Sequence, residues 1–230
     1  MSRTMLLLMA AMLGAGCASQ VGAGRATTLP QGEAQWGPFL EASVLGPKLQ
    51  RDTPTQVPWL QFGLAYHRGV TERLEVGGRA WVFGLPDVFT TMGAAADFKW
   101  QLTAPDGGQG WDVALLASPT YQRVTLGGAP SWHIAGVTAP LLFGLNLGEH
   151  QLVFGPRVGD YVLASYGQTP LNTFWVGASA GFMWRVSKQL ELQPELVLHY
   201  SPVAFNGESL AGDTRGTSVL SLGMGLAWDG

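Results

Sequence analysis

Residues 217–228, TSVLSLGMGLAW, alternate large apolar residues with small or polar ones along their whole length. Successive side chains of a β-strand point to opposite faces, so the two kinds of residue would lie on opposite sides of one strand. The first face carries Leu220, Leu222, Met224, Leu226 and Trp228. The second carries no charge, whereas a strand of a soluble protein normally places polar and charged residues opposite its apolar face. The pattern is typical of a strand whose large apolar face meets lipid.

The composition of the chain favours a membrane protein over a nucleic-acid-binding or disulfide-rich one. The chain has 230 residues, enough for one domain of ordinary size. Charged residues make up 13% of it, about half of the roughly 25% usual in soluble domains. The net charge is −3 and there is no basic stripe, which argues against nucleic-acid partners. A single cysteine excludes an intrachain disulfide.

The N-terminus has the pattern of a bacterial secretory signal. The apolar run of residues 5–13 is too short for a membrane-spanning helix, which needs about 20 residues. Small residues at 14–16 then precede Cys17, and this arrangement resembles the lipobox of bacterial lipoproteins. The resemblance implies that residues 1–16 are a signal peptide and that Cys17 becomes a lipidated N-terminus. Ala18 after the cysteine implies transport to the outer membrane. An ordinary signal peptide that contains a cysteine is the alternative.

Ten β-strands, and no helix of useful length, are expected after residue 35. Their ranges are 36–45, 58–67, 74–83, 89–102, 111–122, 132–147, 151–162, 172–186, 190–200 and 217–228. Most reach the 9–11 residues that a tilted transmembrane strand needs, and an even number is usual in bacterial barrels. We therefore predict an all-β fold, a closed antiparallel up-and-down transmembrane β-barrel over residues 36–230, with eight strands as the alternative. Residues 17–35 lack periodicity and are expected to form a lipid-anchored tether or a periplasmic entry segment.

The connections between these strands differ in length and indicate an orientation. Four compact ones would lie at one end of the barrel, at residues 68–73, 103–110, 148–150 and 187–189. The other end would hold the longer connections 46–57 and 201–216, although 84–88 is also short. Outer-membrane barrels have short periplasmic turns and longer outer loops. We therefore expect the N-terminus and the C-terminus of the mature chain on the periplasmic side.

All nine tryptophans lie near the ends of expected strands. Tryptophan and tyrosine favour the membrane interfaces because their rings are apolar and carry one polar group. The expected periplasmic girdle consists of Trp36, Trp100, Trp111, Trp184 and Trp228. The expected outer girdle consists of Trp59, Trp81, Trp132, Trp175, Tyr121, Tyr161 and Tyr200. Core aromatics of a soluble β-sandwich are the alternative, but they would not form two girdles.

Residues 69–77, GVTERLEVG, resemble the periplasmic hairpins of Gram-negative outer-membrane β-barrel proteins. Together with the lipobox-like start, the mature chain resembles the small outer-membrane barrels that carry a lipoprotein-type signal peptide. The resemblance implies a barrel in the outer membrane of a Gram-negative bacterium, in contact with its lipid. It implies no particular activity.

Alternation within the strands also defines an expected lumen. In residues 190–200 a leucine-rich face stands opposite a face with Glu191, Glu195 and His199. A charge facing hydrocarbon costs roughly 2–4 kcal/mol at the bilayer midplane, so the polar face must point inward. The same argument gives the lumen set Glu41, Glu75, Arg79, Asp97, Lys99, Asp112, Arg157, Arg185, Glu191 and Glu195. The mixed charges predict ion pairs that plug the lumen, and a narrow polar channel is the alternative.

The sequence contains no recognisable catalytic, cofactor or metal-binding motif. Its four histidines are scattered, and it has neither a Gly-x-Ser-x-Gly elbow nor a Walker loop. The candidates for an enzyme at the outer rim are His133 and His199, with Asp160 and Asp213 in the same half of the barrel and Ser201 or Ser209 as nucleophile. Three functions stay open: a structural or surface-interaction barrel that meets an envelope or surface partner through its outer loops, a narrow pore for small solutes, and a rim hydrolase or acyltransferase. We favour the first, without cofactor or enzymatic activity.

Overall fold

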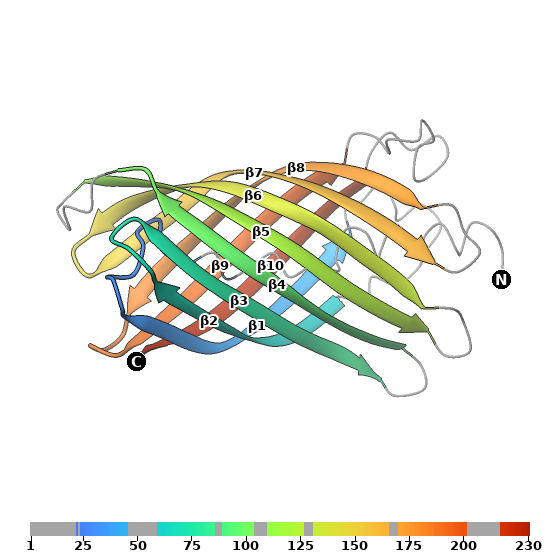
Figure 1. Ribbon diagram of the computed structural model, residues 1–230, viewed down its shortest axis with the longest axis horizontal. Helices are drawn as coiled ribbons and strands as arrows, with labels where there is room; N and C mark the ends of the chain where they lie inside the picture. Colours follow the sequence, from blue (N-terminus) through green and yellow to red (C-terminus); the bar gives the residue numbers. More distant parts are fainter. Residues whose placement is uncertain are drawn as a thin grey trace.

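Ten β-strands close into a single barrel (Figure 1). The computed structural model describes residues 22, 24–45, 59–85, 89–103, 110–126, 131–165, 170–201 and 217–230. The strands are β1 (Ala34–Leu45), β2 (Trp59–Gly69), β3 (Leu74–Leu85), β4 (Phe89–Gln101), β5 (Trp111–Leu126), β6 (Trp132–Leu147), β7 (His150–Ser165), β8 (Leu171–Arg185), β9 (Leu190–Ser201) and β10 (Thr217–Asp229). The prediction of a closed ten-stranded antiparallel barrel is confirmed, and the eight-stranded alternative is wrong. No helix among the described residues has the length and apolarity needed to cross a membrane.

Each strand pairs antiparallel with its neighbours in sequence, and β10 returns to pair with β1. At this closing seam Ser43 lies opposite Ser221, and their hydroxyl oxygens are 2.6 Å apart. Closure gives both terminal strands a second partner, so neither exposes an edge with unpaired N–H and C=O groups. This is the property that allows a sheet to stand in a lipid bilayer.

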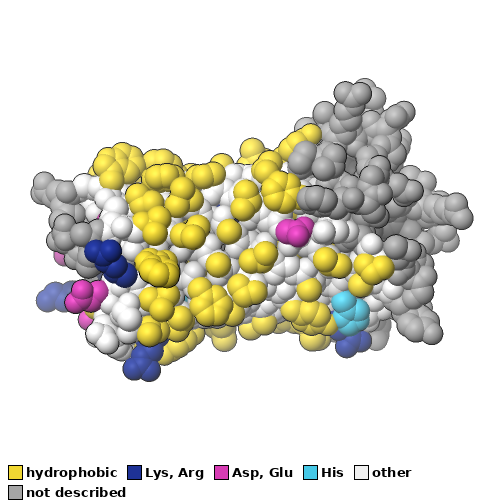
Figure 2. All heavy atoms as spheres, turned by 45° about the horizontal axis from the view of Figure 1, so that its top comes forward, with side chains coloured by type: hydrophobic (Ala, Val, Ile, Leu, Met, Phe, Trp, Pro, Cys, Tyr) yellow, Lys and Arg dark blue, Asp and Glu magenta, His cyan; other side chains and the backbone are white. Residues whose placement is uncertain are grey.

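The two faces of the sheet differ as the alternation in β10 predicts. Leu220, Leu222 and Met224 are exposed on the outside, whereas Ser221 and Gly223 are buried on the inside. In the other strands most exposed side chains of the middle are also apolar, and most of the charged side chains in view lie near one end (Figure 2). A water-soluble protein would bury a continuous apolar surface of this kind, whereas a barrel in a membrane exposes it to lipid.

The two ends of the barrel are distinct. One end, here called the turn end, holds the short connections 70–73, 148–149 and 186–189. The C-terminus lies at the same end, where the Gly230 N–H donates to the Ala34 carbonyl at the start of β1. The opposite end, here called the loop end, holds the connections 46–58, 86–88, 127–130, 166–170 and 202–216. The expected outer loops 46–57 and 201–216, apart from Ser201, lie outside the described residues.

The predicted aromatic girdles are only partly present. Trp36, Trp100, Trp111 and Trp184 are exposed at the turn end, in the places that the periplasmic girdle requires. Trp81, Trp175 and Tyr161, however, are 3%, 1% and 3% exposed and lie inside the barrel. Their assignment to the outer girdle was wrong because it considered only their height along the strand. Each is an even number of residues from a lumen position on its own strand (Arg79, Ser179 and Arg157), so it shares the inner face.

Candidate functional site

The lumen gathers most of the charge that the strands carry. All ten residues of the expected lumen set lie on the inner face of the barrel, and nine of them are buried. The tenth, Arg185, lies at the turn end with its side chain 21% exposed. Charged groups removed from water are tolerated when they are paired and hydrogen-bonded. The arrangement of these partners therefore decides what the lumen can do.

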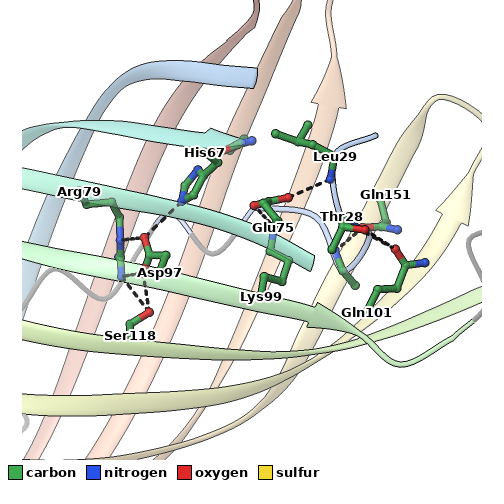
Figure 3. A network of polar contacts seen from close by, with 12 residues as sticks. Thr28, Leu29, His67, Glu75, Arg79, Asp97, Lys99, Gln101, Ser118 and Gln151 are labelled. Atoms are coloured by element: carbon green, nitrogen blue, oxygen red, sulfur yellow. Dashed lines mark hydrogen bonds and ion pairs between the residues drawn. The ribbon is translucent and has the colours of Figure 1, made fainter. Parts of the chain in front are cut away.

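A cluster around Asp97 occupies the middle of the lumen (Figure 3). Arg79 of β3 donates from Nε to Asp97 Oδ2 at 2.8 Å and from Nη2 to Oδ1 at 2.9 Å. The Ser118 hydroxyl of β5 donates to Oδ1 at 2.5 Å, and His67 Nε2 of β2 lies 3.2 Å from Oδ2. Four neighbouring strands thus contribute to one carboxylate. The bidentate guanidinium contact is the geometry that favours a fixed arginine–carboxylate pair.

Two further ion pairs lie near this cluster. Lys99 Nζ is 2.8 Å from Glu75 Oε1, which connects β4 with β3. Arg157 of β7 pairs with Glu195 of β9, reaching across β8. All four side chains are at most 6% exposed. The lumen at this depth therefore contains positive and negative groups in contact, rather than a ring of one charge that would attract one kind of ion.

Amide and hydroxyl groups surround Asp112 at the turn end. Asn146 donates to Oδ2 at 2.5 Å, and Gln101 donates to Oδ1 at 3.3 Å. Thr103 also donates to Oδ1, at 3.2 Å, and Gln151 donates to Oδ2 at 3.4 Å. These neutral donors supply four hydrogen bonds to the buried carboxylate.

The pairs at the turn-end mouth differ from the simple cross-strand pattern. Arg185 lies directly opposite Glu191 in the β8–β9 register, but their charged atoms are 3.9 Å apart. Arg185 forms a closer contact with Asp229 of β10. The Glu191 carboxylate instead binds Arg25, whose Nη2 lies 2.5 Å from Oε2. Sequence reasoning missed both Arg25 and Asp229, because neither lies at a recognisable inner position of an expected strand.

The N-terminal segment, defined here as Gly22 and residues 24–33, has its first part inside the barrel, whereas residues 30–33 are exposed at the turn-end mouth. The chain runs from Gly22, beside Glu195 and Arg79 at mid-depth, to Gln31, which bridges Gly69 at the turn end. The expected tether or periplasmic entry segment over residues 17–35 stays a prediction; of its described part, Ala34 and Gln35 belong to β1 and the residues before them lead from the lumen to the turn end. The segment has no periodicity to reveal its place, and its only signal is the small size of its first residues.

Large side chains fill the lumen toward the loop end. The Trp81 indole donates to Gln122 at 3.2 Å, and Gln122 in turn contacts Thr91. The Trp175 indole donates to Thr173 Oγ1 at 3.0 Å. These aromatic rings close space that small side chains would leave open. Near the turn end, in contrast, two cavities of about 490 Å³ and 560 Å³ flank the N-terminal segment.

The structure does not bring the rim candidates together. His133 and Asp160 are exposed on the outer surface, and His133 Nδ1 lies 2.6 Å from the Tyr121 hydroxyl. His199 is 4% exposed inside the lumen, so the sheet separates it from the other two. The Ser201 hydroxyl donates to a backbone carbonyl, and Asp213 and Ser209 lie outside the described residues.

A hydrolytic site would need a histidine that reaches both a serine and a carboxylate. In the described part of the chain, His67 reaches the Asp97 carboxylate, but Ser118 binds that same carboxylate and not the histidine. Within the same residues, no group of three or more His, Cys, Asp or Glu is placed to hold a metal ion. His67 and Ser118 thus each contact the Asp97 carboxylate and do not form a serine–histidine pair.

Comparison with known proteins finds likeness in structure only. No protein-family model and no curated protein sequence matches the chain. Neisserial surface protein A matches 85% of this chain and 96% of its own at 8% identity, with a TM-score of 0.40. The outer membrane protease OmpT of Escherichia coli matches 86% and 97% at 8% identity, with a TM-score of 0.46. Ail, the attachment invasion locus protein of Yersinia pestis, matches 87% and 99% at 11% identity, with a TM-score of 0.31.

Proposed function

We propose that this protein is an outer-membrane β-barrel of a Gram-negative bacterium with its turn end in the periplasm. The exposed apolar band around the barrel supports a place in lipid, because its leucine, valine and phenylalanine side chains would otherwise face water. The exposed tryptophans at the turn end support an interface there. Cys17 carries lipid in this proposal and anchors the mature N-terminus. In this proposal the lipid of the outer membrane is also the partner that the apolar outer surface of the barrel contacts.

The lumen is closed by its own charged side chains, and the role of the protein is structural or in surface interaction. The observation that carries this proposal is the pair of ion contacts at mid-depth, Arg79–Asp97 and Arg157–Glu195, whose side chains are 3–5% exposed. A rigid barrel commonly carries recognition on its loops. The outer loops 46–57 and 201–216 would therefore present the surface that meets an envelope or surface partner, without enzymatic activity.

Conductance in planar lipid bilayers tests the closed lumen. Purified full-length protein should give no steady single-channel current, because the mid-depth ion pairs and the aromatic residues beyond them occupy the lumen. A variant of the exposed turn residue, Arg73→Ala, serves as a control for handling and insertion and should also be silent. Stable current steps in the unmodified protein would contradict the proposal.

A narrow pore for small solutes is the second candidate function. The two cavities beside the N-terminal segment favour it, since they already open part of the lumen at the turn end. If the unmodified protein conducts, a bulky substitution on the inner face should reduce the current. Ser179→Trp is suitable because Ser179 is 7% exposed and points into the lumen. If the single-channel current of Ser179→Trp equals that of the unmodified protein, the current does not pass through the barrel lumen.

A further inference from the structure

The N-terminal segment is held inside the barrel mainly through its backbone. The N–H groups of Gly22, Ala26, Thr28 and Leu29 donate to side-chain oxygens, at 2.9, 2.7, 2.9 and 3.0 Å. The four acceptors come from four different strands: Glu195 of β9, Gln151 of β7, Gln101 of β4 and Glu75 of β3. Figure 3 shows Thr28 and Leu29 beside the last three of these. The lumen therefore offers a set of acceptors spaced for a polypeptide main chain.

Three side chains of the segment contact the wall specifically: Arg25, Ala26 and Thr28, whose hydroxyl donates to the Glu72 carbonyl at 2.9 Å and to Gln101 Oε1 at 3.0 Å. The Arg25 guanidinium binds Glu191, whose side chain is 0% exposed, and donates to the Glu149 carbonyl at 2.6 Å. The next residue, Ala26, is 0% exposed and packs with Leu142, Met183 and other buried apolar residues of the wall. The adjacent Gly144 leaves room for the Ala26 methyl group, because a Cβ on Gly144 would lie 2.8 Å from it. The site thus fits a cation followed by a small residue.

The segment does not fill the space around it. One cavity is lined by Thr28 and Pro30 of the segment on one side and by His67 and Lys99 of the wall on the other. The second cavity lies between the segment and Asp112 and Asn146. A permanent part of the core would pack closely on all sides. Among the described residues of the segment only Ala26 belongs to a buried apolar cluster, and the hydrogen bonds of Gly22, Thr28 and Leu29 are polar contacts that another peptide could also make.

We propose that the turn-end half of the lumen is a binding site for an extended polypeptide, which Gly22 and residues 24–29 of this chain occupy in the structure. The expected ligand is a peptide that carries a cationic residue at the position of Arg25 and a small residue at the position of Ala26. Its main-chain N–H groups at the positions of Thr28 and Leu29 must be free to donate. The strand-borne acceptors recognise the backbone, and Glu191 and the Ala26 pocket select the two side chains. This inference adds a ligand class to the proposed barrel and does not depend on whether the lumen conducts.

The reaction rates of introduced thiols test whether the segment lies in the lumen of the full-length chain. Cys17 is the only cysteine, so a Cys17→Ser background leaves a single introduced thiol. Ala26→Cys should react with a soluble maleimide at least tenfold more slowly than Thr27→Cys, because Ala26 is fully buried and Thr27 lines both cavities. Equal rates would overturn the proposal.

Peptide binding tests the site itself. In the full-length variant Arg25→Glu the chain's own segment is repelled by Glu191, and a fluorescent peptide of residues 22–33 should bind. Unmodified protein should bind it at least a hundredfold more weakly, because the tethered segment competes at high effective concentration. Arg73→Glu is the matched control and should behave as the unmodified protein, and the characteristic gel shift of the unheated barrel shows that each variant is folded.

A second peptide distinguishes backbone recognition from simple charge attraction. N-methylation at the positions of Ala26, Thr28 and Leu29 removes three donors and keeps the charge of Arg25. This peptide should lose at least tenfold in affinity for Arg25→Glu. Equal affinity of the two peptides, or no binding of either one, would overturn the proposal. Neither measurement uses conductance, so the closed lumen and the peptide site can fail independently.

Discussion

Asp97 depends on partners from three other strands, and its side chain is 3% exposed. The parity of the strands predicts that Asp97, Arg79 and Glu75 share the lumen, because alternation assigns each residue to a face. It does not predict which residues meet, because partners such as Arg157 and Glu195 lie two strands apart. The partner of Glu191 was beyond prediction for another reason. Arg25 comes from a segment with no regular structure, so no register relates the two.

Removing Arg79 should therefore be costly. Arg79→Ala leaves Asp97 buried beside a histidine and a serine, and breaking a buried pair in this way typically costs about 3–5 kcal/mol. We expect a clear loss of unfolding free energy in a urea titration of the folded barrel in lipid vesicles. Arg73→Ala, at an exposed turn, should change it by no more than about 0.5 kcal/mol. Similar losses for both variants would mean that water already fills the lumen around Asp97.

At the scale of the strands, alternation with a period of two was enough to predict all ten elements and the face of the lumen charges, whereas Trp81, Trp175 and Tyr161 were assigned to the wrong face. Strand ends were less predictable: β1 begins at Ala34, two residues before the expected start, and β5 and β7 extend beyond the expected 122 and 162. Strand length in a barrel can exceed the membrane thickness, so the apolar pattern fades before the hydrogen bonding ends. The N-terminal segment was not predicted at all, since its conformation is set by acceptors on distant strands.

Two Gly-Pro pairs interrupt the regular ladders. Gly37 precedes Pro38 in β1, and Gly155 precedes Pro156 in β7. Proline has no N–H for the ladder, and at both sites the partner backbone comes so close that a Cβ on the glycine would lie 1.7 Å from a carbonyl oxygen. The β6–β7 pairing is interrupted between Pro140–Arg157 and Phe143–Phe154. The glycines are therefore required by the close approach of two strands.

Gly155→Ala should destabilise the barrel by about 1–3 kcal/mol, because the Leu141 carbonyl can only be avoided by moving the backbone. Gly225→Ala is the matched control on another inner strand position. Its new methyl group would lie 3.3 Å from the flexible Gln193 side chain, which can move aside. The temperature at which the folded band is lost on gels should fall more for Gly155→Ala. A larger fall for Gly225→Ala would refute the steric argument.

At the scale of the whole molecule, the proposed lipid anchor on Cys17 limits how deeply the N-terminal segment can lie in the lumen. The Gly22 amide binds Glu195, which is five residues into β9 from Leu190. This depth is about 13 Å at ~3.3 Å per residue and a strand tilt of about 40°. The five residues from Cys17 to Gly22 span at most about 17 Å. A lipid on Cys17 must also pass around the barrel rim to reach the membrane, so little slack remains.

Lipidation at Cys17 should therefore loosen the segment. Cys17→Ser should abolish labelling by a radioactive fatty acid, and unchanged labelling would rule out this anchor. Because lipidation converts the Cys17 thiol into a thioether, Ala26→Cys supplies the one free thiol in both backgrounds. We expect this thiol to react faster with maleimide in the lipidated chain than in Cys17→Ser, since the anchor pulls Gly22 away from Glu195. Equal rates would show that the chain between the anchor and Gly22 reaches the membrane without disturbing the segment, and that lipid and lumen site act independently.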